Sequence, residues 1–150
     1  MVTFISNSEA DTVALGLEWG KTAGPGWVFG LIGPLGAGKT RLVRGIAQGL
    51  GVKSRVRSPT FTLVHEYTGG RWPLFHIDLY RVETIDQFET AGLGQYMFSL
   101  EGITVIEWFD HWPTSESGLI PTSPGHRLRR AIIEVLHENV RRITYEDSCT

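Results

Sequence analysis

The stretch GPLGAGKT, residues 33–40, decides how the rest of the chain is interpreted. It fits the phosphate-binding-loop (P-loop) pattern Gly-x-x-x-x-Gly-Lys-[Ser/Thr], in which glycines let backbone N–H groups turn inward around phosphate oxygens. The apolar run WVFGLIG (27–33) precedes it and the amphipathic segment KTRLVRGIAQGLG (39–51) follows it, as the motif requires. The expected phosphate-binding residues are Gly33, Pro34, Leu35, Gly36, Ala37, Gly38, Lys39 and Thr40.

Lys39 and Thr40 have separate expected roles within this loop. The Lys39 ammonium is placed to reach the β- and γ-phosphates, which is a catalytic as well as a binding role. The Thr40 hydroxyl is placed to bind Mg²⁺, and a helix that begins at Lys39 adds the positive end of its dipole. The loop therefore predicts ATP and Mg²⁺ as cofactors.

The composition is that of an ordinary soluble domain. The 150 residues are 41% hydrophobic and 20% charged, so we expect one domain, 1–150, with a single core. Lys and Arg number 14 against 16 Asp and Glu, and the net charge of −2 supplies no basic field for direct nucleic-acid binding. Cys149 is the single cysteine, and no stretch has the pattern of a signal peptide or membrane span. We expect a cytoplasmic protein that does not enter a membrane.

Hydrophobic patterning divides the chain into strands and helices. Strands are expected at 2–6 (an edge), at 27–33 and 102–108 (buried), and as hairpins at 61–67 with 72–80 and 127–136 with 140–146. Helices are expected at 9–23 (capped by Ser6 or Ser8), 39–51 (ended by Gly51) and 83–93 (ending at Gly92), with irregular segments at 52–60 and 109–126. This order predicts an α/β fold of P-loop NTPase type: a mixed sheet with a parallel centre, antiparallel hairpins and flanking helices.

Two acidic residues end apolar runs, and either could hold the metal. Asp78 ends PLFHID and Glu107 ends ITVIE. A P-loop enzyme needs a second carboxylate at a strand end to hold the metal and its water, usually on the strand beside the P-loop strand. The alternative is that such an acid caps a following helix. Because the sequence does not give the strand order, the division of roles between Asp78 and Glu107 stays open at this point.

Other distinctive residues have a functional and a structural interpretation. In RSPTF, residues 57–61, Ser58 and Thr60 carry hydroxyls that could sense a γ-phosphate, or the segment is an ordinary turn into a strand. His65 and His76 alternate with apolar residues, and we expect them to be core or surface side chains. The remaining aromatic and basic residues are expected to pack or to form a solvated face, and these are Trp108, Trp112, Arg127, Arg129, Arg130, Arg141 and Arg142.

Missing motifs narrow the class of P-loop protein. A GTPase would carry Asn-Lys-x-Asp and Asp-x-x-Gly, and neither occurs, because the only asparagines are Asn7 and Asn139. A motor ATPase would be larger. A minimal ATPase that works with a partner, a small-molecule kinase and a nucleotide-gated binding module remain as alternatives.

Four motifs together resemble one family. GPLGAGKT, SPTFTLVHEY, HIDLYR and VIEW occur, over about residues 8–108, in the order and spacing of the TsaE (YjeE) family. These are bacterial ATPases required for making threonylcarbamoyladenosine in tRNA. The chain departs from the family after VIEW, where FDHWP (109–113) stands in place of the usual proline and acid.

The resemblance implies a role for each matching residue. Thr40 and Glu107 would contact Mg²⁺, and Asp78 would orient or activate the attacking water. The other nucleotide-binding residues would be Ser58 and Thr60 in a switch-like loop, Thr12 and Arg141 near adenine, and Trp108 of VIEW. The implied partners are the TsaB and TsaD proteins, of which TsaD transfers the group to tRNA. Slow, partner-dependent ATP hydrolysis would reset that complex between turnovers, and contact with tRNA would be indirect.

Overall fold

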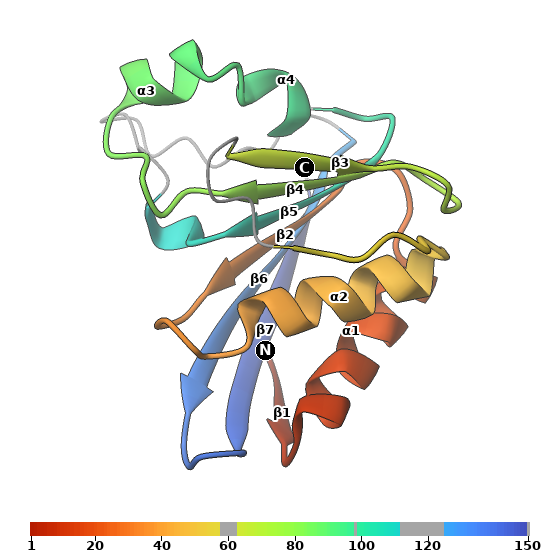
Figure 1. Cartoon of the computed structure of the whole chain (residues 1–150), viewed down its shortest axis with the longest axis vertical. Helices are drawn as coiled ribbons and strands as arrows, with labels where there is room; N and C mark the ends of the chain where they lie inside the picture. Colours follow the sequence, from red (N-terminus) through yellow and green to blue (C-terminus); the bar gives the residue numbers. More distant parts are fainter. Residues whose placement is uncertain (58–62, 98, 112–124, 150) are drawn as a thin grey trace.

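The computed structural model describes residues 1–57, 63–97, 99–111 and 125–149. Its strands are β1 Val2–Ser6, β2 Trp27–Ile32, β3 Val64–Tyr67, β4 Leu74–Asp78, β5 Ile103–Glu107, β6 Arg127–Val135 and β7 Arg141–Cys149. Its helices are α1 Glu9–Thr22, α2 Lys39–Leu50, α3 Ile85–Thr90, α4 Gly94–Met97 and the 3₁₀ turn η1 Phe109–His111. The strands form a seven-stranded sheet in the order β1-β7-β6-β2-β5-β4-β3 (Figure 1).

The sheet has the parallel centre and antiparallel additions that the sequence predicted. β2 pairs in parallel with β5 and β6, and β5 pairs in parallel with β4. β7 pairs antiparallel with β6 and with the edge strand β1, and β3 pairs antiparallel with β4 at the other edge. Because parallel strands end on the same side, the loops that follow β2, β4 and β5 meet at the carboxyl ends of these strands.

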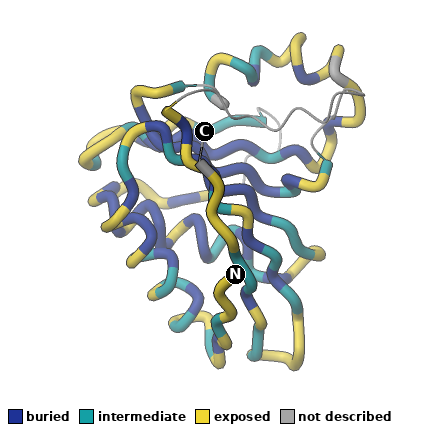
Figure 2. The backbone as a smooth tube through the Cα atoms, turned by 180° about the vertical axis from the view of Figure 1, so that it is seen from behind, coloured by how far each residue is buried: buried dark blue, intermediate teal, exposed yellow. Residues whose placement is uncertain are grey.

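Helices lie on both sides of the sheet. α1 and α2 pack on one face, over side chains that include Leu31 and Val105. α3 and α4 lie on the opposite side (Figure 1), where Phe88 packs with Val28 and Ile106. Figure 2 shows the central strands as a buried layer between these outer segments. The central strands thus have apolar side chains on both faces, as expected for parallel strands covered by helices.

Helices α1 and α2 approach each other backbone to backbone. Gly16 and Gly20 of α1 face Gly45 and Gly49 of α2, and a Cβ atom added at Gly45 would lie 2.2 Å from the carbonyl oxygen of Val13. Only glycine fits such an approach. The contact fixes the start of α2, which immediately follows the P-loop, relative to α1.

The ends of two elements differ from those expected, for local reasons. The predicted strand 72–80 stops at Asp78, because its Oδ1 accepts a hydrogen bond of 2.8 Å from the N–H of Tyr80 and turns the chain. The predicted helix 83–93 is shorter than expected: α3 covers Ile85–Thr90 and the chain turns at Gly92, where φ is +69°. The short helix α4, which follows at Gly94–Met97, was not predicted. Of the two candidate caps of α1, Ser8 accepts the N–H of Asp11 at 3.1 Å.

The other expected elements form close to their predicted bounds, and the last strand continues to Cys149. Residues 61 and 62 of the first hairpin and 112–124 of the irregular segment lie outside the described residues. Among the residues that the structure describes, none of the helices has the length and apolar character needed to cross a membrane.

Candidate nucleotide-binding site

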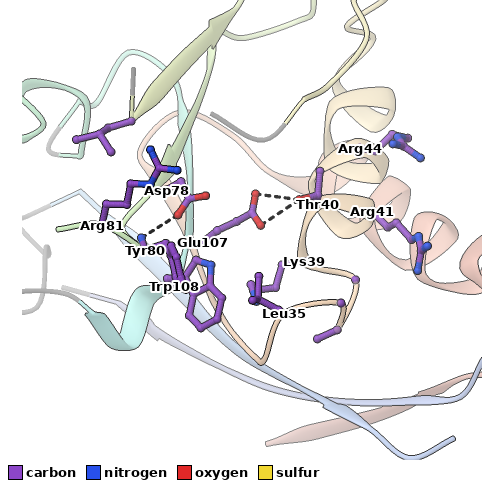
Figure 3. Close-up of a pocket in the computed structure, with 14 residues that line it drawn as sticks. Leu35, Lys39, Thr40, Arg41, Arg44, Asp78, Tyr80, Arg81, Glu107 and Trp108 are labelled. Atoms are coloured by element: carbon purple, nitrogen blue, oxygen red, sulfur yellow. Dashed lines mark hydrogen bonds between the residues drawn. The ribbon is translucent and has the colours of Figure 1, made fainter. Parts of the chain in front are cut away.

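A pocket of about 440 Å³ lies where β2, β4 and β5 end and α2 begins (Figure 3). The P-loop and the first turn of α2 form one side of it, and the two acids Asp78 and Glu107 project into it from neighbouring strands. Its lining also includes Trp108, Tyr80, Arg81, Arg44 and Leu63. The structure therefore brings the predicted loop and both predicted carboxylates into one cavity.

The glycines of the P-loop are required by its geometry. Gly36 and Gly38 have φ values of +76° and +102°, a region that side chains disfavour. Gly33 is needed for a different reason, because a Cβ atom there would lie 2.8 Å from the carbonyl oxygen of Ile133 on β6. The loop thus turns tightly against the neighbouring strand before α2 begins.

The Lys39 side chain lies inside the loop. Its Nζ donates hydrogen bonds to the carbonyl oxygens of Gly33 and Pro34, the latter at 2.9 Å, and lies 3.8 Å from the centroid of the Trp108 ring. Burial lowers the pKa of Lys39, opposed by nearby carboxylates of which Glu107 acts most strongly. In this state the loop's own carbonyl oxygens satisfy the ammonium.

Thr40 and Glu107 meet directly. The Thr40 hydroxyl donates to Glu107 Oε1 at 3.1 Å and to Oε2 at 3.3 Å, and Glu107 is buried, with 3% exposure. Glu107 ends β5, which pairs with the P-loop strand β2. The sequence could not say which acid neighbours that strand, and the strand order places Glu107 there.

Asp78 lies one strand farther away. It pairs in register with Glu107 across β4 and β5, it is half-buried, and it lines the same pocket. Its Oδ1 accepts from Tyr80 N–H, so the carboxylate has a fixed orientation at the end of the strand (Figure 3). The two acids are therefore adjacent but have different environments.

The donor set at this site suits a hard cation with few protein ligands. Thr40 and Glu107 offer a hydroxyl and a carboxylate, while no group of three or more His, Cys, Asp or Glu side chains gathers among the described residues. Mg²⁺ prefers oxygen ligands and keeps waters and substrate phosphates, so one carboxylate and one hydroxyl fit it, whereas zinc needs more protein ligands.

A second, smaller pocket of about 150 Å³ lies on the far side of the P-loop. Thr12 and Arg141, both predicted near adenine, line it. The Arg141 guanidinium donates to the carbonyl oxygens of Ala37 at 3.0 Å and Gly36 at 3.2 Å, tying the β6–β7 hairpin to the loop. The Thr12 hydroxyl is hydrogen-bonded to Ser6 at 2.8 Å. Both residues thus also support the local structure.

Several site residues were missed or cannot be placed. Ser58 and Thr60 lie outside the described residues. Tyr80 and Arg44 line the pocket without having been predicted, although Tyr80 belongs to the quoted HIDLYR motif. His76 of the same motif was expected to be a core or surface residue and is fully buried, but the hydrogen bond between its Nε2 and the carboxylate of Glu107 was not predicted. No local signal indicates this contact, because it depends on the pairing of β4 with β5.

A P-loop between a central parallel strand and the following helix, with acids at the ends of neighbouring parallel strands, defines the P-loop NTPase class. Within that class, the chain belongs to the TsaE family. The family profile, described as "Threonylcarbamoyl adenosine biosynthesis protein TsaE", matches residues 6–143.

Individual proteins agree with this assignment. A Nostoc sp. protein named "tRNA threonylcarbamoyladenosine biosynthesis protein TsaE" is 43% identical over 120 residues, which cover 78% of this chain and 73% of that protein. A Bacillus subtilis protein of the same name is 49% identical over 86 residues, which cover 57% of this chain and 52% of that protein. The crystal structure of Bacillus subtilis YdiB matches with a TM-score of 0.76 and 30% identity, covering 99% of this chain and 86% of that chain.

Proposed function

We propose that the protein binds ATP with Mg²⁺ and hydrolyses it slowly in the service of threonylcarbamoyladenosine formation in tRNA. The observation that carries this proposal is the contact of Thr40 with Glu107 at the junction of the P-loop and β5. This contact sets a hydroxyl and a carboxylate, two groups of the kind that Mg²⁺ prefers, beside the P-loop. The names of the Nostoc and Bacillus relatives support the biological process.

We assign phosphate binding, metal binding and activation of water to different residues of the site. Backbone N–H groups of the loop and the N-terminus of α2 bind the phosphates, and Lys39 turns from the Gly33 and Pro34 carbonyl oxygens to the phosphate oxygens. Thr40 and Glu107 would hold Mg²⁺, which neutralises charge on the phosphates when bound. Asp78, which faces the same pocket, orients the attacking water and accepts its proton.

A partner completes the site. Among the described residues the pocket is open to solvent, and two of its lining residues, Tyr80 and Leu35, are 48% and 74% exposed. Water in an open site weakens electrostatic stabilisation of the transition state. We therefore propose that a TsaB–TsaD complex covers the site and raises the rate, and that tRNA contacts this complex rather than the chain itself.

Phosphate release from the purified protein tests the proposal. We expect slow release of phosphate from ATP without any acceptor, a higher rate with TsaB–TsaD, and loss of activity when EDTA removes Mg²⁺. ADP formation that requires an added metabolite would instead identify a small-molecule kinase. Tight ATP binding without turnover, with the partners present, would identify a nucleotide-gated binding module.

A further inference from the structure

His76 is a polar side chain buried completely inside the core. It lies on β4 with 0% exposure, two residues before Asp78, and its ring stacks on Tyr67 at 6.5 Å between centroids. Its Nδ1 has no hydrogen-bond partner among the described residues. Burying an imidazole with an unpaired nitrogen costs free energy that a leucine or phenylalanine would not.

The Glu107 carboxylate is the partner of the other ring nitrogen. His76 Nε2 is hydrogen-bonded to Glu107 Oε2, and both groups are shielded from water. Since an ionised carboxylate only accepts hydrogen bonds, Nε2 carries the hydrogen and donates it. The contact spans β4 and β5 on the face of the sheet that α2 covers, where Val105 packs beside His76.

Glu107 is thereby fixed from two sides. His76 holds it from the core, and the Thr40 hydroxyl holds it from the first turn of α2 at 3.1 and 3.3 Å. A carboxylate at a strand end has free rotation about its side-chain bonds unless neighbours restrict it. Partners that orient a metal-ligating carboxylate commonly change metal affinity by about 10- to 100-fold when they are removed.

We infer that His76 is a positioning residue that aims the Glu107 carboxylate at Thr40 and at the Mg²⁺ of bound ATP. This inference rests on the proposed function, since the metal is the one that Thr40 and Glu107 would share. His76 touches neither the nucleotide pocket nor the phosphate loop in the described contacts, so it acts through Glu107.

Two amide variants separate this role from simple filling of the core. In His76→Gln the amide nitrogen reaches about as far as Nε2, whereas in His76→Asn it reaches only as far as Nδ1. Both introduce the same polar group into the same buried place. His65→Gln on β3, whose ring contacts Arg57 and Tyr67 instead of Glu107, is the matched control. His76→Phe replaces His76→Asn if the asparagine variant does not fold.

The readouts are ATP affinity with and without Mg²⁺, by calorimetry, and melting temperature without metal. We expect His76→Asn to raise, by at least about tenfold, the Mg²⁺ concentration at which half of the Mg²⁺-dependent gain in ATP affinity is reached. Its ATP affinity without metal should stay within about twofold of that of the parent protein. His76→Gln recovers most of the loss, and His65→Gln matches the parent. In a Glu107→Gln background, His76→Asn has no further effect on the Mg²⁺ requirement, and its effect on melting temperature is non-additive.

Equal Mg²⁺ requirements in the parent and in the His76→Asn protein would overturn the inference and leave the proposed function intact. Equal losses in the glutamine and asparagine variants, or full additivity with Glu107→Gln, would likewise reduce His76 to a core residue. A parent protein that binds no ATP, or binds it without regard to Mg²⁺, would overturn the proposed function itself.

Discussion

The ammonium of Lys39 lies 3.8 Å from the centre of the Trp108 ring, so the indole ring covers the lysine inside the P-loop. Trp108 holds a φ of +57°, unusual for a non-glycine residue, directly after the β5 acid. A cation over an aromatic face is stabilised by about 0.5–2 kcal/mol, less where water competes. Under the proposed function, phosphates of bound ATP would displace this arrangement and the two carbonyl contacts of Lys39.

Replacing Lys39 tests the loop directly. Lys39→Ala removes the cation that offsets β- and γ-phosphate charge, and backbone N–H groups replace it only in part. We expect ATPase activity to fall at least about tenfold, or about 1.4 kcal/mol of barrier, in a protein whose circular dichroism and melting curve remain cooperative. Unchanged ATPase activity in the folded variant would refute the assigned role of the loop.

We expect neutral variants of Asp78 and Glu107 to affect different steps, hydrolysis in one case and Mg²⁺-dependent nucleotide binding in the other. Glu107→Gln disturbs the group that contacts Thr40 and should weaken Mg²⁺-dependent nucleotide binding. Asp78→Asn should leave binding near that of the parent while phosphate release is lost. Nucleotide titrations with and without Mg²⁺, beside phosphate-release assays, measure both effects. The opposite pattern would show that the two roles are exchanged.

The α1–α2 contact should be intolerant of a single added methyl group. Helix propensity alone favours Gly45→Ala by about 1 kcal/mol. The added Cβ would lie 2.2 Å from a backbone oxygen, and overpacking of a rigid contact costs about 1–3 kcal/mol or more. We expect net destabilisation in urea unfolding. Gly24→Ala is the control, because nothing lies within 4 Å of its added Cβ, and it should unfold like the parent.

Low pH should reduce the stability that the ion pair of Asp147 with Arg129 contributes where β6 pairs with β7. A hydrogen bond from Arg129, at 2.7 Å, is the main cause that lowers the pKa of Asp147 below its ordinary value. The ionised form is therefore favoured in the folded state, and its contribution to stability is complete above the unfolded pKa and is lost as pH falls through the folded one. Asp147→Asn should lower stability at neutral pH and flatten its decline below about pH 4. Parallel stability–pH curves would contradict this.

The sequence pattern predicted most helices and strands because each of them is formed by residues that are close together in the chain. The P-loop, its strand and its helix follow from residues 27–51 alone, and the hairpins follow from short turn signals. Strand order does not, because pairing between β2 and β5 joins segments some 75 residues apart. The sequence therefore supplied both acids and left open which one neighbours the P-loop strand.

Residues that act at a distance in the chain were harder to recognise. Arg141 was placed near adenine, but nothing in its own hairpin indicates that its guanidinium reaches the carbonyl oxygens of Gly36 and Ala37. His76 resembles any core residue until β5 is set beside β4. The role of Gly45 and Gly49 could not be predicted for the same reason, since their close contact exists only when α1 packs against α2.

The last prediction tests whether hydrolysis belongs to an assembly. The described part of the site brings together the P-loop, the contact between Thr40 and Glu107, and Asp78. Arg41, Arg44 and Arg81 line the same pocket, which is open on one side among the described residues. If ATP raises the affinity of a partner that covers this pocket, linkage requires that the partner raise the affinity for ATP by the same factor. We expect a TsaB–TsaD complex to bind the ATP form, measured in pull-downs and by calorimetry, more strongly than the ADP or nucleotide-free form. Thr40→Ala, which loses the hydroxyl on Glu107, should remove most of that preference. Equal association in the three nucleotide states would separate the loop from partner binding, whereas a preference retained in the Thr40→Ala protein would place the coupling elsewhere in the site.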